Sequence, residues 1–167
     1  MRITVQLEPP AAPPGTVEYT WDPDTDILSA QLGSRGDGAG MSGSVGLEGS
    51  DGSWLVLDVK GGHIHAVEVA VWPDVRRVSA LAPPATVEDA AVIVPARRSQ
   101  PDVASLEVDT RLSADTNSAE NTFHFRLGRS DEARTVRLAR DVLLDVDAQS
   151  RIAGLWLLNV PPCPQPS

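Results

Sequence analysis

The sequence predicts a mainly β protein, with about eight antiparallel strands that come from two repeated four-stranded meanders. One observation is that short apolar or alternating segments are separated by turn residues, chiefly Gly, Pro, Asp and Asn. The other is an internal echo between residues 54–73 and 141–161. Each stretch reads as an apolar strand ending in Asp-Val, a tight polar turn, a second apolar strand and a proline, which is typical of a β-hairpin.

The first unit spans residues 17–72. Residues 17–21 alternate between apolar and polar types and predict a strand, residues 22–24 predict a turn, and residues 27–32 predict the returning strand. A short strand near residues 45–47 then leads into the first hairpin. These segments together make one predicted meander.

The second unit spans residues 106–160 and follows the same order. Residues 106–112 and 122–127 predict two strands joined by a longer polar loop, and residues 135–138 lead into the second hairpin. Each half-core is too small to be stable alone, so we expect the units to pack together as a two-sheet sandwich or a partly closed barrel.

The remaining segments are predicted to be connections. Residues 1–16 form a Pro-rich N-terminal arm, and residues 161–167 form a Pro-rich tail. The connector of residues 73–105 contains Thr86 followed three residues later by Asp89, which resembles a capping box. One short helix is therefore expected between the two units.

Charge and composition narrow the range of partners. The net charge is −9, from 23 acidic and 14 basic side chains, so a phosphate backbone would be repelled and no nucleic acid partner is expected. An acidic surface suits a basic protein partner. A second copy of the chain, as a homo-oligomer, is the other partner expected. No apolar run approaches the ~20 residues that a membrane helix needs, and no secretory signal is recognisable, so a cytoplasmic protein is expected.

Two segments carry a resemblance to a known family. Residues 21–28 and residues 144–155 resemble the bacterial family named domain of unknown function 2283, whose pattern is a Tyr-Asp-Pro-like turn, a strand, and Val-Asp-x-Asp-x-x-Gly-x-Ile-x-Gly-Ile-Glu. This sequence has Trp156 where the family usually has an acidic residue, whereas Glu68 keeps that residue in the first unit. The resemblance implies a β fold and, from the gene pairs of some members, a toxin–antitoxin-like role.

His63 and His65 are the candidates for a metal site. Residues two apart in a strand share a face, so both imidazoles could hold one ion. The nearby carboxylates of Asp58 and Glu68 have the opposite strand parity to His65 and do not complete a site. No metal and no cofactor are therefore expected, and the alternative places His63 in the hairpin turn.

Acidic turn residues are the candidates for partner binding. Asp22, Asp24 and Asp26 alternate like the start of a calcium loop, but Ile27 stands where such a loop has glycine. A solvated turn is therefore expected. Asp147 is the corresponding candidate in the second unit.

The tryptophans suggest either core packing or a cavity. Trp21 and Trp54 are the candidates for capping an apolar cavity, where an amphipathic ring can orient a ligand. Trp156 lies in a segment, residues 152–158, that is apolar on both faces. That pattern predicts a strand covered on both sides.

Two classes of function remain open at this point. The first is a non-catalytic acidic binding or interaction protein, such as an antitoxin-like or immunity-like inhibitor or an assembly component. The second is a small β-barrel enzyme or ligand carrier, of the cyclase or isomerase type, with a Trp-containing apolar pocket for a small molecule. Its acid and base groups would be Glu68, Asp58 or His65.

Overall fold

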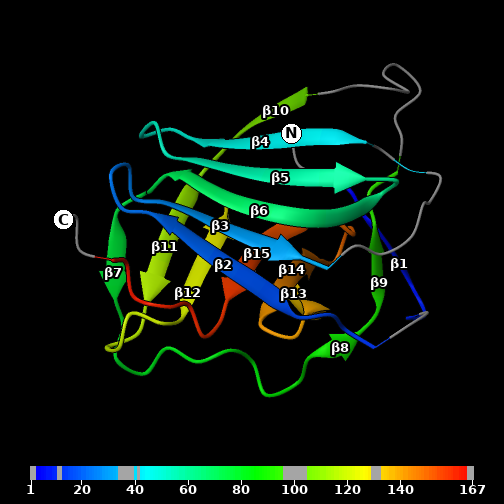
Figure 1. The fold of residues 1–167 in the computed structure, drawn as a ribbon. Helices are drawn as coiled ribbons and strands as arrows, with labels where there is room; N and C mark the ends of the chain where they lie inside the picture. The colour runs from blue at the N-terminus through cyan, green and yellow to red at the C-terminus, as the bar shows by residue number, and fades with distance from the viewer. Residues whose placement is uncertain are drawn as a thin grey trace.

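The computed structural model describes residues 3–10, 13–33, 40, 42–95, 105–128 and 133–164, and for residues 105–110 it describes the backbone alone. Every regular element in this part of the chain is a β-strand (Figure 1). The strands are β1 (Gln6–Glu8), β2 (Val17–Asp22), β3 (Ile27–Leu32), β4 (Gly43–Gly49), β5 (Trp54–Lys60), β6 (His63–Val71), β7 (Val75–Arg77), β8 (Glu88–Asp89), β9 (Ala91–Ile93), β10 (Ser105–Thr110), β11 (Leu112–Thr116), β12 (Phe123–Leu127), β13 (Ala133–Ala139), β14 (Val142–Asp147) and β15 (Ile152–Leu157).

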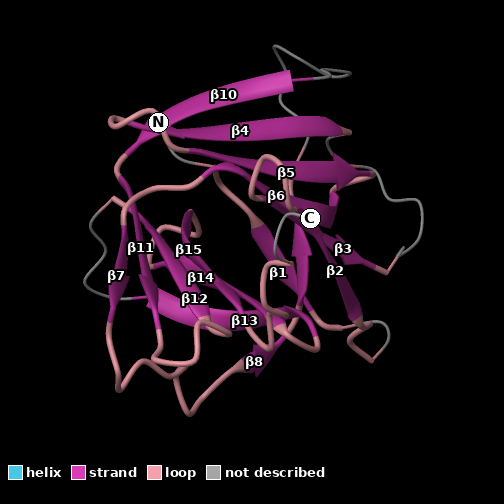
Figure 2. Cartoon of the chain, turned by 60° about the vertical axis from the view of Figure 1, so that its left-hand side comes forward, coloured by secondary structure: helices cyan, strands magenta, loops and turns pink. Residues whose placement is uncertain are grey.

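The strands form two large sheets that pack face to face across one apolar core (Figure 2). One sheet has six strands in the order β10-β4-β5-β6-β3-β2, and the other has seven in the order β7-β11-β12-β15-β14-β13-β8. A single cluster of buried residues draws on both sheets, including Leu28 and Leu57 from the first and Phe125 and Leu144 from the second. The all-β prediction is confirmed, the arrangement is layered rather than a closed barrel, and the estimate of eight strands was too low.

The helix expected before Pro95 is absent, since residues 86–95 contain β8 and β9 instead. Glu88 and Asp89 pair in parallel with Val136 and Arg137 at the edge of β13. The two Glu88 carboxylate oxygens also each accept a 2.7 Å hydrogen bond from the Arg134 guanidinium. Covering a free sheet edge overrides the local capping signal.

Neither unit is a plain four-stranded meander. In the six-stranded sheet, β4, β5 and β6 follow one another, but β3 pairs with β6 rather than with β4. In the seven-stranded sheet, β13, β14 and β15 follow one another, and β12 pairs with β15. Leu28 lies opposite Val69, and Phe123 opposite Leu157, so this Greek-key pairing keeps the core face of each sheet continuously apolar.

The strand predicted at residues 106–112 is divided between the two sheets. Residues 105–110 form β10, which pairs in parallel with β4, whereas β11 begins at Leu112 in the other sheet. The predicted boundary between units therefore does not separate the sheets. Pairing with β10 removes the free edge that β4 would otherwise expose.

Both sheets carry an irregularity at the same register position. The shift lies between Asp58 and Val59 where β5 pairs with β6, and between Asp145 and Val146 where β14 pairs with β15. Ile64 lies opposite Val59 as Ile152 lies opposite Val146. The extra residue of each bulge is His65 or Ala153, and a bulge re-aims the side chains around it.

The seven-stranded sheet is covered on both faces. All residues of β14 and β15 are buried, yet Leu143 and Trp156, which are 1% and 4% exposed, lie outside the core cluster. β7 and β8 lie at opposite edges of this sheet and are joined by residues 78–87 (Figure 1). The prediction that residues 152–157 are covered on both sides is confirmed.

The predicted N-terminal arm is partly wrong, because residues 3–8 belong to the fold. Ile3 and Val5 are 3% and 1% exposed within the core cluster. The Ile152 N–H donates to the Ile3 carbonyl, and the Val5 N–H donates to the Ser150 carbonyl, both at 2.8 Å. Burying two β-branched side chains outweighs the turn-forming tendency of the prolines that follow.

Candidate functional site

The outer face of the six-stranded sheet collects most of the polar residues that the sequence singled out. Side chains alternate along each strand, so Leu55 and Leu57 point to the core while Trp54, Val56 and Asp58 point away from it. The pairing of the neighbouring strands extends this face. We call it the acidic face, and its charged and aromatic members are Glu18, Asp22, Glu48, Trp54, Asp58 and Glu68.

The charge on this face is not neutralised within the chain. Strands β2 to β6 contain five carboxylates and a single cationic residue, Lys60, apart from the histidines. None of the five forms an ion pair with any residue that the structure describes. The seven-stranded sheet differs, because its carboxylates have partners. Four of them pair with arginines, in Arg76–Asp115, Arg126–Asp115, Arg134–Glu88, Arg137–Asp89 and Arg151–Asp147, and Asp145 lies beside His124.

Trp54 lies on the acidic face and is 42% exposed. Its Nε1 atom is 2.7 Å from the position that a Cβ on Gly46 would occupy, so the indole lies across the backbone of β4. Its pairing partners are Glu48 on β4 and Val71 on β6, and Val71 is also exposed. The prediction that Trp54 caps an interior cavity is therefore wrong, because strand parity places it on the solvent side.

Trp21 has a structural role. Its indole N–H donates to the Pro161 carbonyl at 2.7 Å, and its ring stacks on Trp72 with centroids 5.7 Å apart. The neighbouring Tyr19 hydroxyl donates to the Leu158 carbonyl at 2.9 Å. These contacts attach the segment after β15 to β2, so the packing interpretation of Trp21 holds rather than the cavity interpretation.

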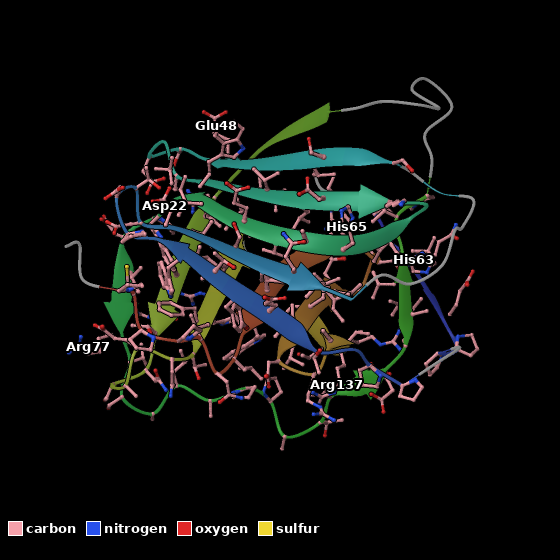
Figure 3. The ribbon with its side chains drawn as sticks, viewed as in Figure 1. Asp22, Glu48, His63, His65, Arg77 and Arg137 are labelled. Carbon is pink, nitrogen blue, oxygen red and sulfur yellow. The ribbon has the colours of Figure 1, made fainter. Side chains whose placement is uncertain are left out.

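The turn between β2 and β3 extends the acidic face beyond its strands. Asp22, Asp24 and Asp26 are all exposed, as the solvated-turn interpretation requires. Asp22 Oδ1 accepts a 3.0 Å hydrogen bond from the Asp24 N–H, and this bond contributes most to lowering the pKa of Asp22. Its carboxylate therefore stays charged, and Figure 3 places Asp22 and Glu48 toward the same end of the sheet.

Asp147, by contrast, is unavailable to a partner, since it is only 6% exposed. Its Oδ1 atom accepts from the backbone N–H groups of Gln149 and Arg151, and its Oδ2 atom accepts from Arg151 Nε, each at 2.9 Å. Burial alone would raise the pKa of Asp147, but these hydrogen bonds and the guanidinium outweigh it and lower the pKa. The prediction of a partner-binding role for Asp147 is wrong, because the turn itself uses the carboxylate.

Replacing Asp147 with Asn should make stability depend less on pH. The lowered pKa of Asp147 means that its ionised form stabilises the folded state above the unfolded value of ~3.9, and that this contribution is lost as the pH falls through the folded pKa. We expect D147N to be less stable than wild type at pH 7 and the gap to shrink below about pH 4. Urea unfolding at a series of pH values measures this, and a gap that does not change with pH would contradict it.

His63 and His65 line a pocket of about 300 Å³ at one end of the sandwich, together with Lys60 and Arg137. Asp58 and Glu68 are not among its lining residues. The pocket thus contains His65 without the two carboxylates that the sequence grouped with it as acid and base. Among the described residues, no group of three or more His, Cys, Asp or Glu side chains is arranged to hold a metal ion.

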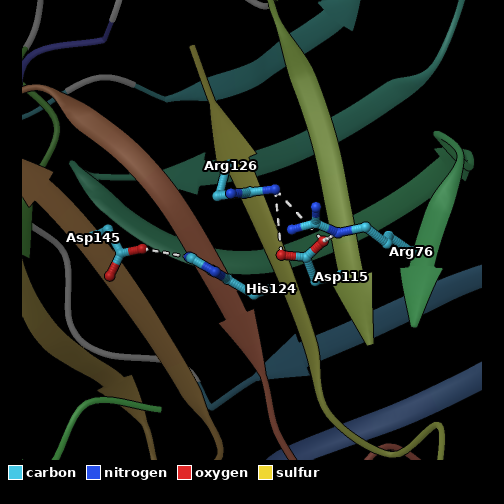
Figure 4. Close-up of polar contacts among 5 residues, drawn as sticks. All are labelled: Arg76, Asp115, His124, Arg126 and Asp145. Carbon is cyan, nitrogen blue, oxygen red and sulfur yellow. Dashed lines mark hydrogen bonds and ion pairs between the residues drawn. The ribbon is translucent and has the colours of Figure 1, made fainter. Parts of the chain in front are cut away.

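A polar cluster on the seven-stranded sheet was missed by sequence reasoning (Figure 4). His124 Nε2 is 2.8 Å from Asp145 Oδ2, and the Thr135 hydroxyl donates to Asp145 Oδ1 at 2.9 Å. The His124 ring also stacks on Trp156, with centroids 3.9 Å apart. Because the hydroxyl points at the carboxylate and not at the imidazole, the cluster lacks the nucleophile–base contact of a hydrolase.

These residues come from four strands, β12 to β15, and are distant in sequence, so no local motif joins them. The one available signal was the polar residue at the centre of Phe123-His124-Phe125, which requires a partner when its strand is covered.

No family model matches this sequence, and no curated protein sequence is significantly similar to it. No helix long and apolar enough to cross a membrane occurs within the residues that the structure describes.

Proposed function

We propose that this chain is a non-catalytic interaction protein that binds a basic partner protein through the acidic face. The observation that carries the proposal is the contrast between the two sheets. The two sheets share the order of their central strands. On the outer face of the seven-stranded sheet Trp156 is only 4% exposed, whereas on the outer face of the six-stranded sheet Trp54 is 42% exposed and lies among carboxylates without ion pairs.

Exposed aromatic and charged groups have complementary roles in such an interface. An aromatic ring held against the backbone offers large contact area at low conformational cost, and tryptophan is enriched among residues that dominate binding energy. The surrounding carboxylates, including Glu48, Asp58 and Glu68, attract a basic surface and accelerate encounter. The acidic face therefore favours a partner with lysines or arginines around an apolar group.

The role that we propose within this class is that of an antitoxin-like or immunity-like inhibitor, or an assembly component, acting in the cytoplasm. The resemblance of residues 21–28 and 144–155 to domain of unknown function 2283 supports it. We also propose that the two units are a tandem repeat of that family, which the common order of their central strands and the matching bulges at Asp58 and Asp145 support.

A short peptide of alternating lysine and leucine residues provides a direct test of the surface. Amide and indole NMR signals of β4 to β6, including the Trp54 side chain, should shift on titration with this peptide, but not with a glutamate–leucine peptide. Binding should weaken as salt rises, because the screening length falls from ~10 Å at 0.1 M to ~3 Å at 1 M.

Two matched double variants show whether the face or the overall charge is responsible. E48Q/E68Q should slow association several-fold, and E8Q/D74N, which removes the same charge from exposed positions outside the acidic face, should leave it unchanged. W54A should mainly speed dissociation. Equal slowing in both double variants, or shifts confined to other strands, would contradict the proposal.

A further inference from the structure

The pocket that contains His63 and His65 lies where three parts of the fold meet. Its wall includes residues 31–33 at the end of β3, Lys60 at the end of β5 and residues 63–65 at the start of β6. Ala90 and Val92, before and within β9, and residues 137–139 of β13 also line it. The lining thus comes from both large sheets and from the small β1–β9 sheet. A volume of about 300 Å³ is at the lower end of the range for small-molecule sites.

Among the residues that the structure describes, the charged side chains of the pocket lining have one sign. Lys60 and Arg137 contribute cationic groups, His63 and His65 contribute imidazoles, and none of the described lining residues is Asp or Glu. Arg137 is held in place by its own contacts, since Nη1 donates to the Arg140 carbonyl at 2.8 Å and Nε lies 3.8 Å from Asp89. In a chain of net charge −9, a described lining with two cationic side chains and no carboxylate differs in sign from the protein as a whole.

Both histidines present a ring nitrogen without a partner. The Nδ1 atoms of His63 and His65 are buried and form no hydrogen bond within the structure. Buried polar atoms in folded proteins nearly always have a partner, because an orphaned one keeps the full cost of its desolvation. Both nitrogens are shielded from solvent, so each imidazole has to turn before its Nδ1 atom can face the pocket. An acceptor bound in the pocket would supply the missing partner and would favour that turn.

Apart from Gln31 and two glycines, the rest of the described wall is apolar. It includes six aliphatic side chains, which are Leu32, Ile64, Ala90, Val92, Leu138 and Ala139. Such a wall suits a hydrocarbon group, whereas the imidazoles and the cationic side chains suit an oxyanion.

From this combination we propose that the pocket binds a small molecule that joins an oxyanion, either a carboxylate or a phosphate, to a compact apolar group. Lys60 and Arg137 attract the anion, and the His63 and His65 ring nitrogens donate to its oxygens. None of the charged or aromatic members of the acidic face is among the described residues that line this pocket.

Titration with butyrate, with inorganic phosphate and with neutral butyramide tests the proposal on the intact chain. The imidazole NMR signals of His63 and His65 should shift in a saturable way with at least one of the two anions, while butyramide produces no such shift. His124, which is bonded to Asp145 on the seven-stranded sheet, serves as the internal control and should not respond. A response to butyrate alone identifies a carboxylic acid, and a response to phosphate alone identifies a phosphate ester.

Matched variants distinguish binding of the anion in this pocket from a general attraction of anions to positive side chains. K60M and H65Q should each weaken anion binding about tenfold, as expected for loss of one hydrogen bond to a charged group. R77M removes the same charge at an exposed position that Figure 3 shows on the far side of the molecule from His63, and it should leave binding unchanged.

Three results would overturn the proposal. One is the absence of a saturable shift with both anions, and another is an equal loss of binding in K60M and R77M. The third is tight binding of Zn²⁺ that depends on both histidines and excludes the anions. Because none of these measurements uses the acidic face, a negative result here leaves the proposed protein interaction untouched.

Discussion

Replacing Trp156 with Ala should lower the free energy of unfolding by about 3–5 kcal/mol, the range for large buried aromatic side chains. The ring is 4% exposed, packs outside the main core and stacks on His124. Its removal would leave a cavity beside His124 and Leu143, which lie opposite it on β12 and β14. The His124 imidazole would also lose its stacking partner, so its hydrogen bond to Asp145 would be less well held.

W54A is the control for this experiment because Trp54 is a tryptophan on the open face of the other sheet. Urea unfolding followed by circular dichroism should show a loss below about 1 kcal/mol for W54A, as surface substitutions usually do. A loss of similar size in the two variants would mean that the outer face of the seven-stranded sheet is no better covered than the acidic face.

Adding one methyl group at Gly154 should also destabilise the fold strongly, by about 3 kcal/mol. A Cβ there would lie 2.6 Å from Asp145 Oδ2 and 2.8 Å from the Phe125 carbonyl oxygen, and real Cβ atoms essentially never come this close. The Phe125 oxygen belongs to the backbone of β12 and cannot turn aside. Overpacking of this kind and disruption of a buried hydrogen bond each cost about 1–3 kcal/mol.

G33A is the matched control, since a Cβ on Gly33 would meet no atom of the described residues within 4 Å. We expect its unfolding midpoint to stay close to that of wild type. The His124 imidazole signal offers a second measurement, because it should change in G154A and not in G33A. If G154A unfolds at the wild-type midpoint with an unchanged His124 signal, the hydrogen bond between His124 and Asp145 does not lie against Gly154.

Several features of this fold follow from local sequence alone. The strands of both hairpins, the alternation of residues 17–21 and the double-sided burial of residues 152–157 were predicted from the period of apolar residues and from turn chemistry. These signals suffice because side chains alternate with a fixed period of two in any strand, whatever the partner strand is.

The helix expected after Thr86 shows where local signals fail. A capping box describes only the first turn of a helix, and nothing in residues 86–91 reveals that the edge of β13 is available to pair with Glu88 and Asp89. The run Val92-Ile93-Val94 was the counter-signal, because β-branched residues favour strands. Burial of Ile3 and Val5 was missed for the same reason, since their partners lie around the second hairpin.

The candidate site residues also fall into two groups, those that local sequence predicts and those that depend on tertiary packing. The acidity of the chain, the position of His63 and His65 in one hairpin and the burial of the strand that contains Trp156 could all be predicted from local sequence. The exposure of Trp54 and the hydrogen bonds of Asp147 within its own turn could not. Nor could the arrangement of Lys60 and Arg137 around the same pocket as the two histidines. The physical reason is that charge and alternation are properties of one strand, whereas exposure and pocket lining depend on which distant strand or segment packs against it.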